Sequence, residues 1–353
     1  MNLAKVYLET AYPDASFTRA HMERLEAAGQ LEWLKVLAKR LEAQGVSYVR
    51  PGMSVADVAV EMEAQEMAQF ASWREELAGK VNNPALRDVE LVFVELATPQ
   101  AVTVHERDNS YAIALDRRMT SFLGVLTAWA YVATSLEMKG VRPLDARLTF
   151  LNALSDHVTL TYTKQVPPAD LEKRELMREE HFDDLDRHLI HDAASLATKF
   201  VLYHELGHVH LGHFDSGEAN RATPADTAQI STFHEHNIEF DADAFANEHL
   251  MDRDGTVVAA VASKVAAPIY LLILAMKEAL LPAAGAAVES RAREHPPSAD
   301  RAKRLYPAQL PPAALDQWEA YFLIPKLLQA VYSSNSFQSS APFFEQHLEN
   351  LRR

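Results

Sequence analysis

Residues 200–214 read FVLYHELGHVHLGHF, and two of the histidines, His204 and His208, are four residues apart. Side chains four apart lie on the same face of an α-helix, with Cβ atoms about 5–6 Å from each other, so both imidazoles can reach one ion. The neighbouring Phe200 and Leu206 are apolar, which favours a buried helix. The segment therefore predicts a buried helix with His204 and His208 as candidate metal ligands.

The residue after the first histidine is Glu205, which completes the pattern His-Glu-x-x-His. In this position a carboxylate can act as a general base on a water that the metal activates. The pattern also arises by chance in helical proteins, and a catalytic zinc ion needs three protein ligands and an open fourth position. The motif alone is therefore not sufficient, and a third ligand has to come from elsewhere in the chain.

The best source of that ligand is the segment 236–251, HNIEFDADAFANEHLM, where Glu239 and Asp243 share one face of an expected helix. Glu239 could complete a set of two histidines and one glutamate. Asp243 could accept the free ring N–H of a ligating histidine and so orient it. We expect Zn²⁺ as the cofactor, with His204, His208 and Glu239 as its ligands.

The chain has 15 histidines, so other ligand sets are open. His234 and His236 precede Glu239 and are its main rivals. On a continuing helix His213 would lie roughly 140° around the axis from His208, so we expect His210 and His213 to be exposed or loosely bonded. A second metal could be held by an acidic, histidine-containing cluster, which we otherwise expect to be a solvated helix face: His181, Asp183, Asp184, Asp186, His188 and His191.

With Glu239 and Asp243, the motif resembles the gluzincin zinc metallopeptidases. FDADAFANEHLM is similar to the second helix of the ImmA/IrrE-type regulatory proteases and their phage-exclusion relatives. His295-Pro296-Pro297-Ser298 with Arg301 resembles a segment near the active site of CaaX-prenyl-protease-like and HtpX-like enzymes. The transition state of peptide hydrolysis needs an oxyanion donor, and His295 and Arg301 are the candidates. Alternatively, the prolines end one helix and Arg301 lies on the exposed side of the next.

The chain is expected to be α+β and mostly helical, with a zincin-like catalytic core. Ser54 and Asp57 resemble a capping box that opens a helix reaching about Leu77. Runs rich in β-branched residues predict a small, mainly antiparallel sheet at 89–97, 101–104 and 111–115, with a further strand pair at 147–153 and 157–163. Helices are expected at 169–190, 192–213, 228–251, 256–280 and 313–332. The domain division is a helical region over 1–84, a metallopeptidase domain over 85–335 and a tail over 336–353.

The composition of the chain excludes several classes of function and partner. The formal net charge is −15, and we find no basic stripe, so no nucleic-acid partner is expected. Cysteine is absent, which excludes disulfides, thiol catalysis and thiolate metal sites and fits a reducing compartment. No secretory signal is visible at the N-terminus. The apolar stretches 118–137 and 255–288 are best interpreted as core helices, so we expect no stable membrane insertion and a cytoplasmic protein.

The sequence therefore predicts a soluble zinc-dependent endopeptidase acting on a protein or peptide substrate. The hairpin over 101–115 could pair with an extended substrate by β-augmentation. Two alternatives stay open: a regulatory or binding protein with a silent zinc site, and a membrane-associated protease. The oligomeric state cannot be inferred from the sequence.

Overall fold

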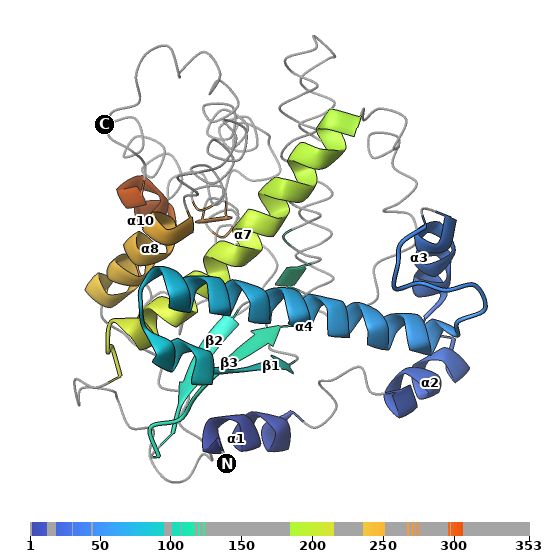
Figure 1. Cartoon of the computed structure of the whole chain (residues 1–353), viewed down its shortest axis with the longest axis horizontal. Coiled ribbons are helices and arrows are strands. Elements are labelled where there is room, and N and C mark those ends of the chain that lie inside the picture. Colours follow the sequence, from blue (N-terminus) through green and yellow to red (C-terminus); the bar gives the residue numbers. More distant parts are fainter. Residues whose placement is uncertain are drawn as a thin grey trace, which may run out of the picture. The chain divides into compact units, whose positions relative to one another are not determined.

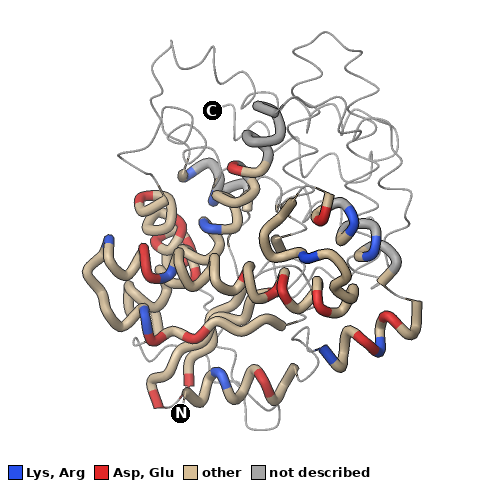
Figure 2. The backbone as a smooth tube through the Cα atoms, turned by 45° about the vertical axis from the view of Figure 1, so that its right-hand side comes forward, with Lys and Arg blue, Asp and Glu red and all other residues tan. Residues whose placement is uncertain are grey.

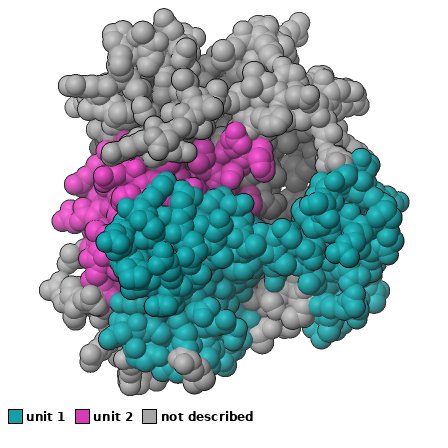
Figure 3. Space-filling view, in the orientation of Figure 1, with its two compact units in different colours: residues 1–96, 100–117, 221–231 teal, residues 97–99, 118–220, 232–353 magenta. Residues whose placement is uncertain are grey.

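The structure is a computed structural model of the whole chain (Figure 1). It describes residues 2–12, 19–29, 31–43, 45–94, 101–106, 108–116, 184–214, 236–250 and 298–305, with the single positions 119, 120, 123, 267, 270, 271, 274 and 296. The chain divides into two compact units (Figure 3). Unit 1 comprises 1–96, 100–117 and 221–231, and unit 2 comprises 97–99, 118–220 and 232–353. The domain boundaries expected from the sequence stay predictions.

Unit 1 begins with the helices α1 (Leu3–Ala11), α2 (Arg19–Ala27), α3 (Glu32–Ala43) and α4 (Val55–Lys80). The capping box at Ser54 is confirmed, because its hydroxyl accepts a hydrogen bond from the backbone N–H of Asp57 at 3.1 Å. The helices α2, α3 and α4 share a buried apolar cluster of Met22, Leu31, Leu34, Ala56 and Ala59. The expectation of a helical N-terminal region is therefore confirmed over the described residues.

After a short 3₁₀ helix, η1 (Pro84–Asp88), come the strands β1 (Glu90–Val94), β2 (Ala101–His105) and β3 (Tyr111–Asp116). They form one sheet in the order β1-β3-β2. The hairpin of β2 and β3 is antiparallel, as expected, but β1 pairs with β3 in parallel. The three described strands thus form a mixed sheet, and the parallel pairing of β1 differs from the mainly antiparallel sheet that the sequence predicts. Apolar patterning locates a strand but does not determine the direction of its neighbour.

Helices cover both faces of this sheet. Val92 and Val94 of β1 face α1, whose Leu8 belongs to the same buried cluster. The intervening Phe93 points to the opposite face, as strand geometry requires, where its ring lies 6.1 Å from that of Phe70 in α4. Figure 1 shows the sheet between α1 and α4. The strands carry few charges, whereas the helices around them carry many (Figure 2).

Unit 2 contains α7 (Asp184–His210), α8 (His236–Leu250) and α10 (Ser298–Leu305). The break expected near residue 191 is wrong: α7 continues through it, and the chain has no glycine or proline between 184 and 206 to interrupt a helix. The helix α8 packs against both α7 and α10. Among the described residues, no helix is long and apolar enough to cross a membrane.

Several predicted elements lie outside the described residues. These are the strand pair at 147–153 and 157–163, the helix at 313–332 and the tail from 336. Of the apolar stretches 118–137 and 255–288, only single positions are described, and those are helical.

Candidate metal centre

The site begins with the C-terminal half of α7, which is buried nearly all round. Phe200 and Tyr203 are fully buried, and so is Leu206 on the next turn. A helix with apolar residues on every side belongs in a protein core. His204, Glu205 and His208 are nevertheless polar, and their exposed fractions are only 7%, 9% and 5%. Buried polar side chains need partners, so this segment depends on the residues that face it.

The residues that face this segment of α7 come largely from α8. Its buried positions Glu239, Ala242, Asp243 and Ala246 are spaced three and four apart and therefore form one face. The two helices approach closely at Gly207: a Cβ there would lie 3.5 Å from the Cα of Ala242. A methyl group at this position would lie directly against the backbone of α8.

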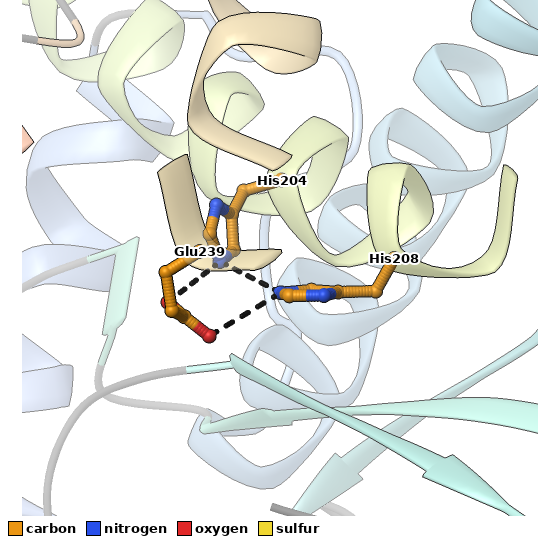
Figure 4. Close-up of side chains that lie close together, drawn as sticks. All are labelled: His204, His208 and Glu239. Carbon is orange, nitrogen blue, oxygen red and sulfur yellow. Dashed lines mark hydrogen bonds and ion pairs between the residues drawn. The ribbon is translucent and has the colours of Figure 1, made fainter. Parts of the chain in front are cut away.

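Three ligand atoms converge between the helices (Figure 4). The Nε2 atoms of His204 and His208 are 3.1 Å apart. Glu239 places Oε2 at 3.5 Å from the first of these nitrogens and Oε1 at 3.6 Å from the second. In the part of the chain that the structure describes, this is the group of three side chains that could hold a metal ion.

The spacing can be compared with that of a real zinc site. Zinc binds histidine nitrogen at about 2.0–2.1 Å in tetrahedral geometry, which separates neighbouring ligand atoms by about 3.3 Å. The three separations above lie on both sides of this value. All three side chains are buried, and together they supply two nitrogens and a carboxylate, a donor set that zinc accepts. These residues therefore fit the metal that the sequence suggests.

Asp243 lies behind His204, on the far side of the ring from the ligand atoms. Its Oδ1 is 2.9 Å from His204 Nδ1, so the ring can donate its N–H to the carboxylate. A proton on Nδ1 leaves the lone pair of Nε2 for a metal. The structure thus places Asp243 where the sequence analysis expected it.

Arg301 of α10 is buried and binds the two buried carboxylates of α8. Its Nε and Nη2 donate to the two carboxylate oxygens of Asp243, each at 2.7 Å. Its Nη1 lies 3.4 Å from Oε2 of Glu239. The alternative of an exposed Arg301 is therefore wrong. With its guanidinium turned to these carboxylates, Arg301 is better placed to hold them than to bind an oxyanion. His295, the other expected oxyanion donor, lies outside the described residues.

The electrostatics follow from burial and from this network. Burial disfavours the imidazolium of His204, but Asp243 and Glu239 outweigh it and raise the pKa to about 10. At His208, burial and the charge of His204 lower the pKa well below its usual value. Burial opposes the carboxylate of Asp243, yet Arg301 keeps its pKa below the ordinary range. Because metal ligands must be deprotonated, a metal would have to displace the proton on Nε2 of His204, while the proton on Nδ1 stays.

The sequence analysis did not single out Tyr270, and it predicted a different environment for His213. Tyr270 is buried with its ring 5.9 Å from that of Phe200, and burial together with the carboxylate of Glu205 raises the pKa of its phenol, although Arg301 acts in the opposite direction. His213 was expected to be exposed or loosely bonded, but it is half-buried and contacts His208. Gly212, directly before His213, is the residue from which the end of the helix could have been predicted.

The rival ligands cannot be placed in the same way. His234 lies outside the described residues, and so does the side chain of His236. In the cluster proposed for a second metal, the side chains from 181 to 188 also lie outside them, and His191 is exposed. His210 stacks on Phe245 with ring centroids 4.9 Å apart.

Comparison with known proteins adds one finding. A family model described as Peptidase U49 matches residues 147–311, a segment that contains the His-Glu-x-x-His motif, Glu239, Asp243 and Arg301. Neither the curated proteins nor the solved structures gave a match. Over this segment the chain is similar to a peptidase family. The match extends neither to the gluzincin clan nor to the ImmA/IrrE resemblance, which stay predictions.

Proposed function

We propose that this chain is a zinc-dependent endopeptidase of the gluzincin type. The observation that carries the proposal is the buried group of His204, His208 and Glu239, in which the two Nε2 atoms are 3.1 Å apart and the two carboxylate oxygens of Glu239 lie 3.5 and 3.6 Å from them. Its three protein ligands leave a tetrahedral position for water or substrate, as catalytic zinc sites do, whereas structural sites have four. The peptidase family match supports hydrolysis as the reaction.

His204, His208 and Glu239 would hold the ion. When bound, zinc supplies a Lewis acid that polarises a carbonyl and makes water a stronger nucleophile at neutral pH. Glu205, which follows the first ligand on the same helix, would take a proton from the attacking water. It would then deliver that proton to the nitrogen of the leaving amine as the peptide bond breaks.

Asp243 and Arg301 would support this chemistry without touching substrate. Asp243 would keep the proton of His204 on Nδ1, and Arg301 would balance the negative charge of Asp243 and Glu239. An oxyanion donor is still required, and we keep His295 as its candidate. The hairpin of β2 and β3 remains our candidate for pairing with an extended substrate. The expected absence of a nucleic-acid partner and the cytoplasmic location also stay predictions.

The proposal can be tested with three proteins: the wild type, His204→Ala and Glu205→Gln. Metal content is measured by inductively coupled plasma mass spectrometry, and cleavage is measured on a proteome-derived peptide library by mass spectrometry. We expect about one zinc per wild-type chain and none in His204→Ala. Glu205→Gln should keep its zinc and lose cleavage, because an amide can bind water but cannot take its proton.

Two results would contradict the proposal. If the wild-type protein binds no zinc either as purified or after reconstitution with zinc, the proposed metal site is wrong. Undiminished cleavage by Glu205→Gln would show that Glu205 is not the base. A protein that binds zinc but cleaves nothing would support the alternative of a regulatory protein with a silent site.

A further inference from the structure

The helix α7 ends in a specific way that brings one more histidine to the site. The backbone N–H of Gly212 donates to the carbonyl of Val209 at 3.3 Å, and that of His213 donates to the carbonyl of His208 at 3.1 Å. Gly212 has a φ of +67°, in the left-handed region that favours glycine. These bonds and this conformation define a Schellman motif with Gly212 in the C′ position.

The motif determines where the side chain of His213 goes. A Schellman turn brings the residue after the glycine back against the side chain three positions before the helix cap, usually in an apolar contact. Here the two residues in contact are His213 and His208. Their Nδ1 atoms lie 2.9 Å apart, and their ring centroids are separated by 5.0 Å. The usual apolar contact is therefore replaced by a hydrogen bond between two imidazoles.

Only one proton can occupy the space between two nitrogens in this bond. His208 points its Nε2 toward His204 and Glu239, and its Nδ1 toward His213. A neutral imidazole that offers the Nε2 lone pair to a metal carries its proton on Nδ1. His208 is then the donor, and His213 accepts through Nδ1 with its own proton on Nε2.

We infer that His213 is a positioning residue for His208: its Nδ1 accepts the Nδ1–H of His208 and so keeps the ring orientation and the tautomer that present Nε2 to a metal. The inference rests on the proposed function, since it assigns a role within that metal site. It gives the second histidine of the motif a partner equivalent to the one that Asp243 provides for the first. The difference is that a neutral acceptor adds no negative charge to a site that already holds the carboxylates of Glu205, Glu239 and Asp243.

The test uses substitutions of His213 that separate bulk from hydrogen bonding. His213→Leu provides an apolar side chain for the Schellman contact but removes the hydrogen-bond acceptor. His213→Asn keeps an acceptor, because its Oδ1 is the same number of bonds from the backbone as Nδ1 of histidine. His210→Leu is the matched control, since His210 is half-buried at the end of the same helix and stacks on Phe245. Zinc affinity is measured on the full chain by competition with a chromophoric chelator.

Loss of a partner to a metal ligand typically weakens metal affinity by about 10–100-fold. We expect a loss of that size in His213→Leu, recovery to within a few-fold of the wild type in His213→Asn, and little change in His210→Leu. The inference is overturned if His213→Leu binds zinc as well as the wild type. It is also overturned if His213→Asn is as weak as His213→Leu, because then the acceptor atom is not responsible.

A second measurement does not depend on zinc affinity. Long-range ¹H–¹⁵N spectra of histidine-labelled protein distinguish the two tautomers of each ring. In the wild type, His208 should be protonated on Nδ1 and His213 on Nε2, and His213→Leu should alter the His208 signals. A wild type that shows this tautomer pair but binds no zinc would refute the metal site and leave the hydrogen bond established. A wild type that binds zinc with His208 protonated on Nε2 would refute the inference alone.

Discussion

Gly207 of α7 faces Phe245 of α8 so closely that a Cβ on the glycine would lie 2.9 Å from the ring carbon Cδ1. The nearest backbone atoms, Cα and the carbonyl oxygen of Ala242, would both be 3.5 Å away. Real Cβ contacts of 2.9 Å essentially do not occur, so any larger residue must displace the ring or separate the helices. A methyl group at position 207 would thus clash with the ring of Phe245, whereas its contacts with the backbone of Ala242 would be of ordinary length.

Gly207→Ala should therefore weaken zinc binding. Alanine favours a helix over glycine by about 1 kcal/mol, but overpacking a core costs about 1–3 kcal/mol. We expect the loss to outweigh the gain, with lower zinc affinity and a lower thermal midpoint. Gly79→Ala in α4 is the control, because its new Cβ would meet nothing within 4 Å. That variant should be stabilised, and equal stabilisation of Gly207→Ala would contradict the tight crossing.

Arg301→Met should destabilise the metal-free protein by about 3–5 kcal/mol, because it removes the guanidinium that binds the buried carboxylates of Asp243 and Glu239. Arg301→Lys should recover only part of this loss, since lysine keeps the charge but cannot form the two parallel bonds to Asp243. Thermal unfolding followed by circular dichroism measures both. Arg304→Met is the control: Arg304 is exposed on the same helix, with its guanidinium 4.3 Å from the ring centroid of Phe240. Equal effects at the two arginines would show that the bonds to the carboxylates contribute little.

An acid-sensitive contact is expected at the start of α4. Hydrogen bonds from Ser54 and then Arg19 hold the pKa of Asp57 below its usual value. A carboxyl with a lowered folded-state pKa contributes stability above its unfolded pKa of about 3.9, and that contribution is lost as the pH falls through the lower folded value. The thermal midpoint of Asp57→Asn should therefore fall less steeply than that of the wild type below pH 4. Asp88→Asn, which removes another exposed carboxylate, should follow the wild type.

Helical spacing explains why so much of the candidate site could be anticipated. His204 and His208 on one helix, and Glu239 and Asp243 on another, each share a face whatever the surrounding fold. Spacing alone could not show that the two faces meet, nor that Arg301 binds Asp243 from a third helix 58 residues farther along the chain. Those relationships depend on tertiary packing.

The errors have equally physical causes. The β-rich runs located all three strands, but strand direction depends on connections that no local pattern contains, so the parallel pairing of β1 was missed. His213 was assigned to a continuing helix, although Gly212 is a typical residue for ending one. A left-handed glycine reverses the chain and changes which residues are neighbours. Angles calculated along an ideal helix do not apply beyond it.

The last prediction compares two aspartates that are two residues apart on α8. Asp243 is buried and contacts both His204 and Arg301, whereas Asp241 is exposed. Asp243→Asn keeps the shape of the side chain, but its NH₂ group cannot accept the hydrogen bond from Nε of Arg301, and the negative charge beside His204 and Arg301 is lost. Zinc affinity should fall by about 10–100-fold, and Glu239→Ala, which removes a ligand, should lose more.

Asp241→Asn should bind zinc nearly as well as the wild type, since its position is roughly 200° around the helix axis from that of Asp243. Competition with a zinc chelator measures all four proteins, and circular dichroism confirms that each variant is folded. The order of affinities is the decisive result: wild type and Asp241→Asn together, then Asp243→Asn, then Glu239→Ala. If the two aspartate variants bind zinc equally well, Asp243 does not orient His204. If Glu239→Ala also keeps its zinc, the third ligand has to be sought at His234 or His236.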